Sequence, residues 1–256
     1  MKNLPQALWV EALKAFHSKM LLFTALGFSF LPLGGGFFMI ILKDPAFARR
    51  VGLISAKAQL TMGAADWPNY LGFLALGTAA VGLILFSLIG SWVFGREFAD
   101  RTVKDLLALP TPRAAIVTAK FILTAGWSVI LIGLVFLIAL LVGAAVGLPS
   151  VPKQIILQGG VTLAVTAAIS LCVTPPIIFF ASAGRGYLPP VGVALLTLAL
   201  AQVAGIIGYG EYFPWAIAGV LAQGGELGIA SFLIVILTGL VGLLMTFFWW
   251  EFADQK

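Results

Sequence analysis

The chain has 256 residues, of which 61% are hydrophobic and only 10% are charged, with a formal net charge of +5. Its mean hydropathy of +1.09 lies far above that of ordinary globular domains, which are about half apolar. This composition excludes a typical water-soluble domain and indicates an integral membrane protein. The single cysteine, Cys172, excludes a disulfide framework and a metal site built from cysteines.

The first predicted element is an amphipathic helix over residues 4–19. Its apolar face repeats at helical spacing and consists of Leu8, Trp9, Ala12, Leu13 and Phe16. Its polar face carries Glu11, Lys14 and Ser18. This pattern is typical of a helix lying flat in a membrane interface. His17, the only histidine, has no accompanying cluster of His, Cys or acidic residues, so we interpret it as a solvated residue and expect no metal site.

Six apolar runs are long enough to cross a hydrocarbon core of about 30 Å as helices. They cover residues 20–42, 70–94, 114–148, 155–182, 188–208 and 227–250. The third run exceeds one crossing, so we expect it to tilt or to project from the bilayer. The sequence therefore predicts an all-α membrane protein in which residues 1–256 form a single transmembrane domain.

The first run contains Pro32, followed by Gly34, Gly35 and Gly36. These residues are compatible with a kink or hinge, because proline removes a helical hydrogen bond. They are equally compatible with the close approach of a neighbouring helix, which small residues allow.

The distribution of lysine and arginine predicts the orientation of the chain. With the N-terminus inside, ten of the 15 basic residues fall in the inner segments and five in the outer ones. Cytoplasmic loops carry the excess of positive charge. We therefore expect both termini in the cytoplasm and the protein in the plasma membrane, the inner membrane of a bacterium, although residues 43–57 place four positive charges outside.

A charged stretch at residues 95–113 separates the second and third runs. Thr102 and Asp105 have the spacing of a capping box, which predicts a short helix beginning at Thr102 and ending before Pro110. Leu106 and Leu107 would leave apolar surface for a partner to cover. The alternative is a loop that only sets topology, with its leucines turned toward the headgroups. Ion pairs at i, i+4, such as Glu97 with Arg101, are too weak to explain the stretch.

This loop resembles the cytoplasmic loop of ABC type-2 exporter permeases, whose common pattern is E-x-x-x-x-T-x-K-x-L-L-x-x-P-x-x-R. Arg101 stands where that pattern often has glycine. In the family the loop holds a coupling helix that docks on an ATP-binding subunit. The resemblance assigns this docking role to Glu97, Thr102, Lys104, Asp105, Leu106, Leu107, Pro110 and Arg113, and the pattern continues to Lys120.

The resemblance further implies an exporter made of two permeases, a homodimer, and two ATP-binding cassette ATPase subunits that hold ATP and Mg²⁺. The chain has no phosphate-binding loop of the G-x-x-x-x-G-K-[ST] type, so we expect it to be a transporter subunit and not itself an enzyme. Membrane lipid is the other expected partner, and nucleic acid is not expected. Residues 209–226 are too short and too polar at their ends to span, which predicts an outer re-entrant or interfacial segment. The family resemblance implies that this segment caps the outer end of the route. Within the family, the size of the chain and this segment resemble permeases for peptide antibiotics.

The fourth run carries a polar stripe with a spacing of four residues. It consists of Gln158, Thr162, Thr166, Ser170 and Thr174. Such a stripe winds slowly around a helix and could line a translocation route between subunits. Alternatively, its hydroxyls serve only helix packing.

No Asp, Glu, Lys or Arg lies in the middle of a run. Carriers coupled to protons or sodium commonly use such charges, so their absence argues against that class and favours an amphipathic or hydrophobic substrate, such as a peptide antibiotic, drug or lipid. An intramembrane enzyme would need a nucleophile with its base, paired carboxylates or a metal cluster. A single histidine and runs without central charges supply none of these, so we do not expect an intramembrane enzyme. The alternative function is a nonenzymatic scaffold or channel subunit without an ATPase.

Overall fold

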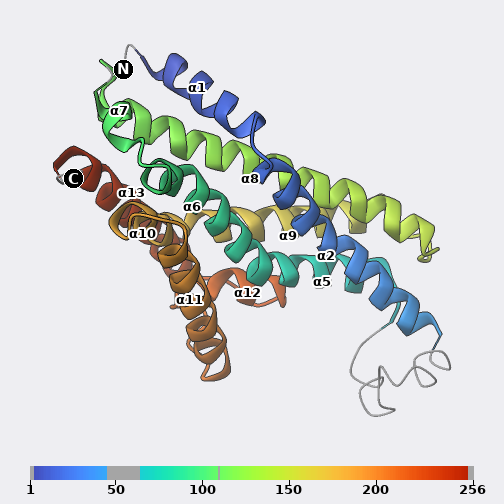
Figure 1. Cartoon of the computed structure of the whole chain (residues 1–256). Helices are drawn as coiled ribbons and strands as arrows, with labels where there is room; N and C mark the ends of the chain where they lie inside the picture. Colours follow the sequence, from blue (N-terminus) through green and yellow to red (C-terminus); the bar gives the residue numbers. More distant parts are fainter. Residues whose placement is uncertain (1–2, 45–63, 109, 253–256) are drawn as a thin grey trace.

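The structure is a computed structural model that describes residues 3–44, 64–108 and 110–252, and all regular structure in these ranges is helical (Figure 1). The helices are α1 (Leu4–Phe16), α2 (Met20–Lys43), α5 (Trp67–Gly77), the π-helix η1 (Thr78–Gly82), α6 (Leu83–Ala99), α7 (Val103–Leu107), α8 (Arg113–Ala145), α9 (Lys153–Cys172), α10 (Pro175–Ala183), α11 (Leu188–Ile206), α12 (Ile217–Ala222) and α13 (Ile229–Phe252). The prediction of an all-α protein is confirmed.

Within the described ranges, six helical stretches are long and apolar enough to cross a membrane, which agrees with the predicted number of spans. They are Met20–Lys43, Trp67–Ala99, Arg113–Ala145, Lys153–Ala183, Leu188–Ile206 and Ile229–Phe252. The second span joins α5, η1 and α6 and is longer at both ends than predicted. The third contains 33 residues, about 50 Å at 1.5 Å per residue, so it exceeds a single crossing as expected.

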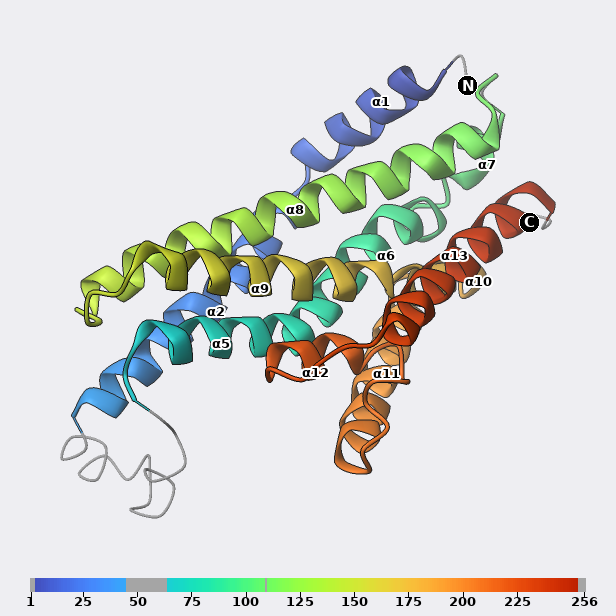
Figure 2. The ribbon, with the colours of Figure 1, turned by 180° about the vertical axis from the view of Figure 1, so that it is seen from behind.

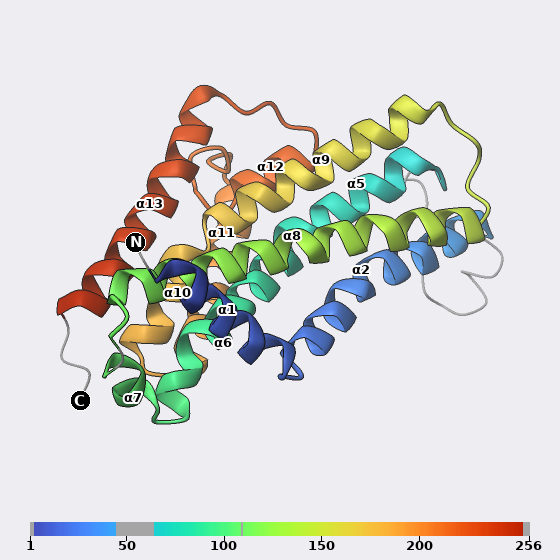
Figure 3. The ribbon, with the colours of Figure 1, turned by 90° about the horizontal axis from the view of Figure 1, so that it is seen from above.

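Both ends of the described chain lie at the same end of the helix bundle as α7 (Figures 1 and 2). The end of α2, the start of α5 and the connection between α8 and α9 lie at the opposite end (Figure 3). This arrangement is the one that an even number of spans requires. The basic residues Arg49, Arg50 and Lys57, which were counted as outer charges, fall outside the described residues.

The fourth span is broken into α9 and α10 because Pro175 and Pro176 carry no N–H groups. Neighbouring side chains satisfy two of the carbonyls near the break. The indole Nε1–H of Trp215 donates to the carbonyl of Val173 at 2.9 Å, and the hydroxyl of Thr174 donates to the carbonyl of Leu171 at 2.7 Å. Broken helices persist within membranes where the freed groups find such partners.

The segment after α11 reaches this break. Helix α12 packs on α9, α5 and η1, and its Ile217 and Ala218 are buried (Figure 2). Helix α13 packs closely on the other side of the break, where a Cβ atom at Gly239 would lie 2.5 Å from the carbonyl oxygen of Cys172. The fold therefore surrounds the proline break with two elements from the end of the sequence.

The glycines of the first span serve helix packing. Helix α2 is continuous from Met20 to Lys43 through Pro32. A Cβ atom at Gly35 would lie 3.0 Å from the rings of Tyr70 and Phe73, and one at Gly36 would clash with Val142. Close approach by α5 and α8 therefore explains two of the three glycines, whereas Gly34 faces open space.

Candidate functional site

The charged loop leaves α6 through a tight turn. Arg101 has a φ of 59°, in the left-handed region, and follows Asp100, the C-cap residue of α6. The N–H of Thr102 donates to the carbonyl of Glu97 at 2.9 Å, and that of Arg101 donates to the carbonyl of Phe98 at 3.3 Å. This pair of bonds is a Schellman motif, which usually places glycine at the left-handed position. The backbone of Glu97 therefore sets the direction in which the loop continues.

The short helix α7 begins directly after Thr102, as the capping box predicted, but the capping bond itself is absent. The hydroxyl of Thr102 makes no capping hydrogen bond, because its φ of −95° and ψ of 1° are outside the extended region that an N-cap needs. The Thr102 carbonyl still accepts from the N–H of Leu106 at 3.0 Å. The turn before the helix, rather than a cap, fixes where α7 starts.

The sequence predicted two uncovered leucines on α7, and this prediction is wrong for Leu106. Val103 is buried, and Leu106 is half-buried against the main core, so this leucine already has a partner within the chain. Thr102, Lys104, Asp105 and Pro110 are exposed. The side chain of Leu107 is outside the description. Apart from Pro110, the exposed residues of this set are thus polar.

Below the turn lies a cluster of four buried or half-buried charges from three helices. The ammonium of Lys120 (α8) lies 2.8 Å from a carboxylate oxygen of Glu97 (α6) and 3.0 Å from one of Glu11 (α1). The ammonium of Lys14 (α1) lies 2.6 Å from Glu11 and 3.1 Å from Glu97. Lys120 also donates to the carbonyl of Val93 at 2.7 Å. We refer to Glu11, Lys14, Glu97 and Lys120 as the charge cluster.

The charge cluster is balanced, with two acids and two bases. Lys120 is fully buried, and Glu97 and Glu11 are 2% and 4% exposed. Taking single charges out of water costs several kcal/mol each, which only good geometry and further hydrogen bonds offset. Burial lowers the pKa of Lys14, but Glu11 and Glu97 outweigh it and raise the pKa above its ordinary value, so Lys14 is held in its charged form.

The predicted i, i+4 pair of Glu97 with Arg101 does not form, since Glu97 points into the charge cluster. The resemblance did mark Glu97 and Lys120, but the sequence offered no signal that Glu11 and Lys14 would join them. The one physical signal was Lys120 itself. A lysine inside an apolar run has to find a partner.

Helix α1 is oriented with its charges toward the protein. Glu11 is buried and Lys14 half-buried against α6 and α8, whereas Trp9 and Phe16 are 67% and 72% exposed. Glu11 on the polar face of α1 thus points into the charge cluster and not into solvent. The exposed apolar face is compatible with the predicted interfacial position, which stays a prediction.

Arg113 ties two spans together. Its guanidinium donates to the carbonyls of Trp250 and Glu251 at 3.1 and 2.9 Å. Basic side chains commonly satisfy carbonyls at the end of a helix in this way. Arg113, which belongs to the family pattern, therefore joins the start of α8 to the end of α13.

The polar stripe of the fourth run passes from the surface into the fold. Gln158 is exposed and Thr162 half-buried, whereas Thr166, Ser170 and Thr174 are buried. The hydroxyls of Thr166 and Ser170 have no hydrogen-bond partner among the described residues. Within one copy of the chain these three hydroxyls are enclosed, and their role in a route between copies stays a prediction.

A pocket that the sequence did not indicate lies between η1, α11 and α12. It has a volume of about 290 Å³ and both polar and apolar walls, which include Ala79, Ala80, Gln202, Trp215 and Gln223. Single π-turns inside helices are frequent at functional sites. This pocket is therefore a second candidate for contact with a transported molecule.

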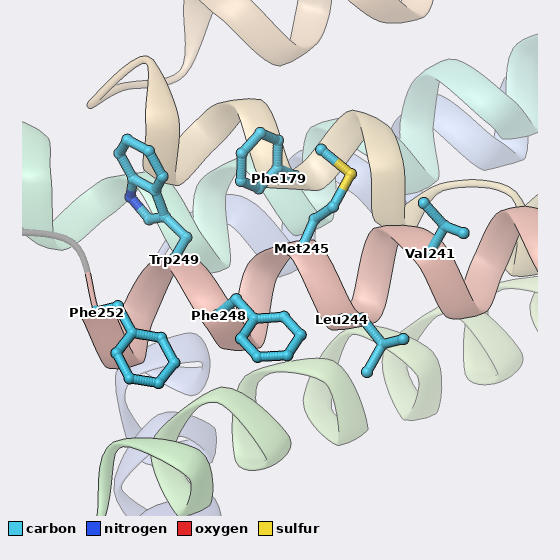
Figure 4. A pocket seen from close by; sticks show the side chains of 7 residues that line it. All are labelled: Phe179, Val241, Leu244, Met245, Phe248, Trp249 and Phe252. Atoms are coloured by element: carbon cyan, nitrogen blue, oxygen red, sulfur yellow. The ribbon is translucent and has the colours of Figure 1, made fainter.

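An apolar groove of about 640 Å³ follows the outer face of α13 (Figure 4). Its walls are Phe179, Val241, Leu244, Met245, Phe248, Trp249 and Phe252. Specific ligand sites place a few polar groups among apolar ones, and here only the indole of Trp249 has a polar atom. The groove is compatible with lipid chains and offers no chemistry for a charged ligand.

No group of three or more His, Cys, Asp or Glu residues that could hold a metal ion occurs in the described part of the chain. His17 is the C-cap residue of α1, and its Nδ1 is 2.9 Å from the carbonyl of Leu13 in that helix.

Comparison with known proteins agrees with this architecture. A family model described as "ABC-2 family transporter protein" matches residues 7–201, more than half of the chain. The bacitracin transport permease protein BCRB of Bacillus licheniformis is 28% identical over 148 residues, which are 56% of this chain and 69% of that protein. The matched residues include most of α1, all of α7 and the charge cluster.

Proposed function

Because the chain belongs to the ABC-2 family of transporter proteins and is a membrane permease of an ABC exporter, we propose that a separate ATP-binding cassette ATPase docks on α7 and drives it. ATP and Mg²⁺ are held by that ATPase. The substrate is an amphipathic or hydrophobic molecule, such as a peptide antibiotic, a drug or a lipid. The name of the relative, a bacitracin transport permease, supports the first of these.

The observation that carries the proposal is the connection between α7 and the spans. In the turn into α7, the N–H of Thr102 donates to the carbonyl of Glu97. The carboxylate of Glu97 is in turn bound by Lys120 of α8 and Lys14 of α1. A displacement of α7 would therefore move α6, α8 and α1 together. A rigid link of this kind is what a helix needs if it is to transmit force from a partner.

The surface that α7 presents suits a protein partner of mixed charge. Lys104 and Asp105 are exposed and adjacent, while Val103 and Leu106 hold the helix on the protein. Complementary charges at the rim of an interface steer association and fix its register. Both described ends of the chain share this side, and we place it in the cytoplasm, where an ATPase is available (Figure 1).

We further propose that two copies of the permease form the exporter. The polar stripe from Gln158 to Thr174 and the pocket beside Gln202 and Gln223 are the candidate contacts for substrate along the route. The segment 209–226, which contains α12, would cover that route from outside.

Co-purification tests the docking proposal. The tagged permease is isolated from its native host in a mild detergent, and the experiment is repeated with the double variant Lys104→Glu/Asp105→Lys. These residues are exposed, so the fold should be retained. We expect a stoichiometric ATPase with the wild type and its loss from the double variant. Lys153→Glu, an exposed residue at the start of α9 on the opposite side, is the matched control and should retain the ATPase.

Retention of the ATPase by the double variant would remove α7 from the interface. Absence of any nucleotide-binding protein from the wild-type sample, under conditions that preserve a known exporter complex, would favour the scaffold or channel alternative.

A further inference from the structure

A third pocket, of about 580 Å³, lies beside the charge cluster where α1, α6 and the start of α11 meet. Three basic side chains, Lys14, His17 and Arg96, line it together with the phenol of Tyr187. It opens at the ends of the spans, next to the turn that leads to α7. From these contacts we propose that the pocket binds the headgroup of an anionic phospholipid.

Arg96 is the residue that most strongly indicates an anionic ligand in this pocket. Its guanidinium carbon lies 4.9 Å from the centre of the Trp92 ring, which holds the planar group in place. No salt bridge joins Arg96 to a carboxylate within the described residues. A guanidinium fixed by stacking has donors arranged to bind a phosphate with two parallel hydrogen bonds.

The other polar groups complete a site of mixed donors. Lys14 keeps one ammonium hydrogen beyond its two carboxylate partners, and its side chain is 24% exposed. Burial raises the pKa of Tyr187, with Asp100 as the next cause, so its hydroxyl stays a donor. Among the described residues, Asp100 is the only carboxylate that lines the pocket, and it can accept from the hydroxyls of a glycerol headgroup.

The surroundings indicate a lipid rather than a dissolved anion. Leu13 lines the pocket and is exposed, and two more exposed apolar residues adjoin lining residues in the sequence. They are Phe16, directly before His17, and Leu188, which directly follows Tyr187 and is 83% exposed. These apolar side chains would contact acyl chains while the basic groups bind the phosphate. Basic pockets between the ends of membrane helices are known to bind acidic headgroups.

The pocket itself depends on the membrane fold alone. The proposed function puts α7 in the cytoplasm, and on that basis the pocket lies in the cytoplasmic leaflet. Lys14 belongs to both the pocket and the charge cluster. A bound headgroup would therefore contact Lys14, which contacts Glu97, the residue whose carbonyl accepts the hydrogen bond of the turn into α7.

Native mass spectrometry of the purified permease, without any ATPase, tests the proposal. Phosphatidylglycerol and phosphatidylcholine with the same acyl chains are titrated into detergent solutions of the wild type, Arg96→Gln and Arg101→Gln. Arg101 is exposed, carries the same charge and does not line the pocket. We expect selective retention of phosphatidylglycerol, about fivefold weaker in Arg96→Gln and unchanged in Arg101→Gln.

Equal retention of the two lipids by the wild type, or equal retention of phosphatidylglycerol by wild type and Arg96→Gln, would overturn the proposal. Inorganic phosphate is added in a further arm, and displacement of the lipid by millimolar phosphate would overturn the lipid assignment in favour of a soluble anion. If Arg96→Gln does not fold, Tyr187→Phe replaces it and should also weaken selective retention. None of these results depends on ATPase docking, so each proposal can fail alone.

Discussion

The ammonium of Lys120 lies 2.8 Å from the carboxylate of Glu97, and this fully buried contact joins the start of α8 to the end of α6. The two residues are separated by the whole loop that contains α7. The contact therefore closes the base of that loop, while Glu11 and Lys14 attach α1 to the same point.

Removing Lys120 should destabilise the protein strongly. Lys120→Met leaves Glu97 and Glu11 with only Lys14 as a positive partner, and breaking a buried pair in this way costs about 3–5 kcal/mol. We expect a large fall in the thermal unfolding midpoint in detergent. Lys153→Met, at an exposed position on α9, is the control and should change little. Addition of Glu97→Gln should recover part of the loss, and a full loss without recovery would show that the two residues do not act as a pair.

Replacing Arg101 by glycine should stabilise the turn into α7. A residue with a side chain pays about 1–2 kcal/mol in the left-handed region, where glycine does not. Against this stands the greater freedom of glycine in the unfolded chain, so we expect a net gain of about 1 kcal/mol or less. The unfolding midpoint measures it. Arg101→Ala removes the same charge without relieving φ, and an equal gain in that variant would point to charge rather than backbone conformation.

The indole of Trp215 should stabilise the break between α9 and α10, because it donates to the carbonyl of Val173 there. Trp215→Phe removes the indole N–H together with part of the ring and leaves the carbonyl of Val173 without its donor. An unsatisfied buried group costs about 1–3 kcal/mol. A lower unfolding midpoint is expected. Trp9→Phe, at an exposed position on α1, provides the comparison. Equal midpoints for the two variants would mean that another group satisfies the Val173 carbonyl.

Lys14 predicts a loss of stability at alkaline pH. Its folded pKa is raised above the unfolded value of about 10.4. A raised folded pKa contributes stability that is fully present below the unfolded pKa and is lost as pH rises through the folded pKa. Unfolding midpoints measured from pH 8 to 12 should therefore fall more steeply above about pH 10.4 in the wild type than in Lys14→Met. Parallel curves would exclude a role for Lys14 in this decline.

The features that could be read from the sequence are those that depend on local chemistry. The six apolar runs and the excess length of the third appear in the structure where they were expected. The start of α7 after Thr102 was expected too, although the turn at Arg101 and not a cap determines it.

Contacts between distant segments were beyond the reach of sequence reasoning. Leu106 was expected to lie open to a partner, yet it packs on the core, and Glu97 pairs with Lys14 and Lys120 rather than with Arg101. Each of these depends on which helix lies beside α6, which hydropathy alone does not specify.

The sequence by itself determined that the chain crosses a membrane as helices, because backbone groups in hydrocarbon must bond within their own segment and only long apolar helices allow this. Only the tertiary structure decided which charges meet, because a buried lysine can be matched by any carboxylate that packing brings within about 3 Å. The sequence alone indicates that Lys120, a lysine within an apolar run, requires a partner. That Glu97 and Glu11 supply it, and that α1 thereby joins the base of the loop that carries α7, follows from the packing of α1 and α6 on α8.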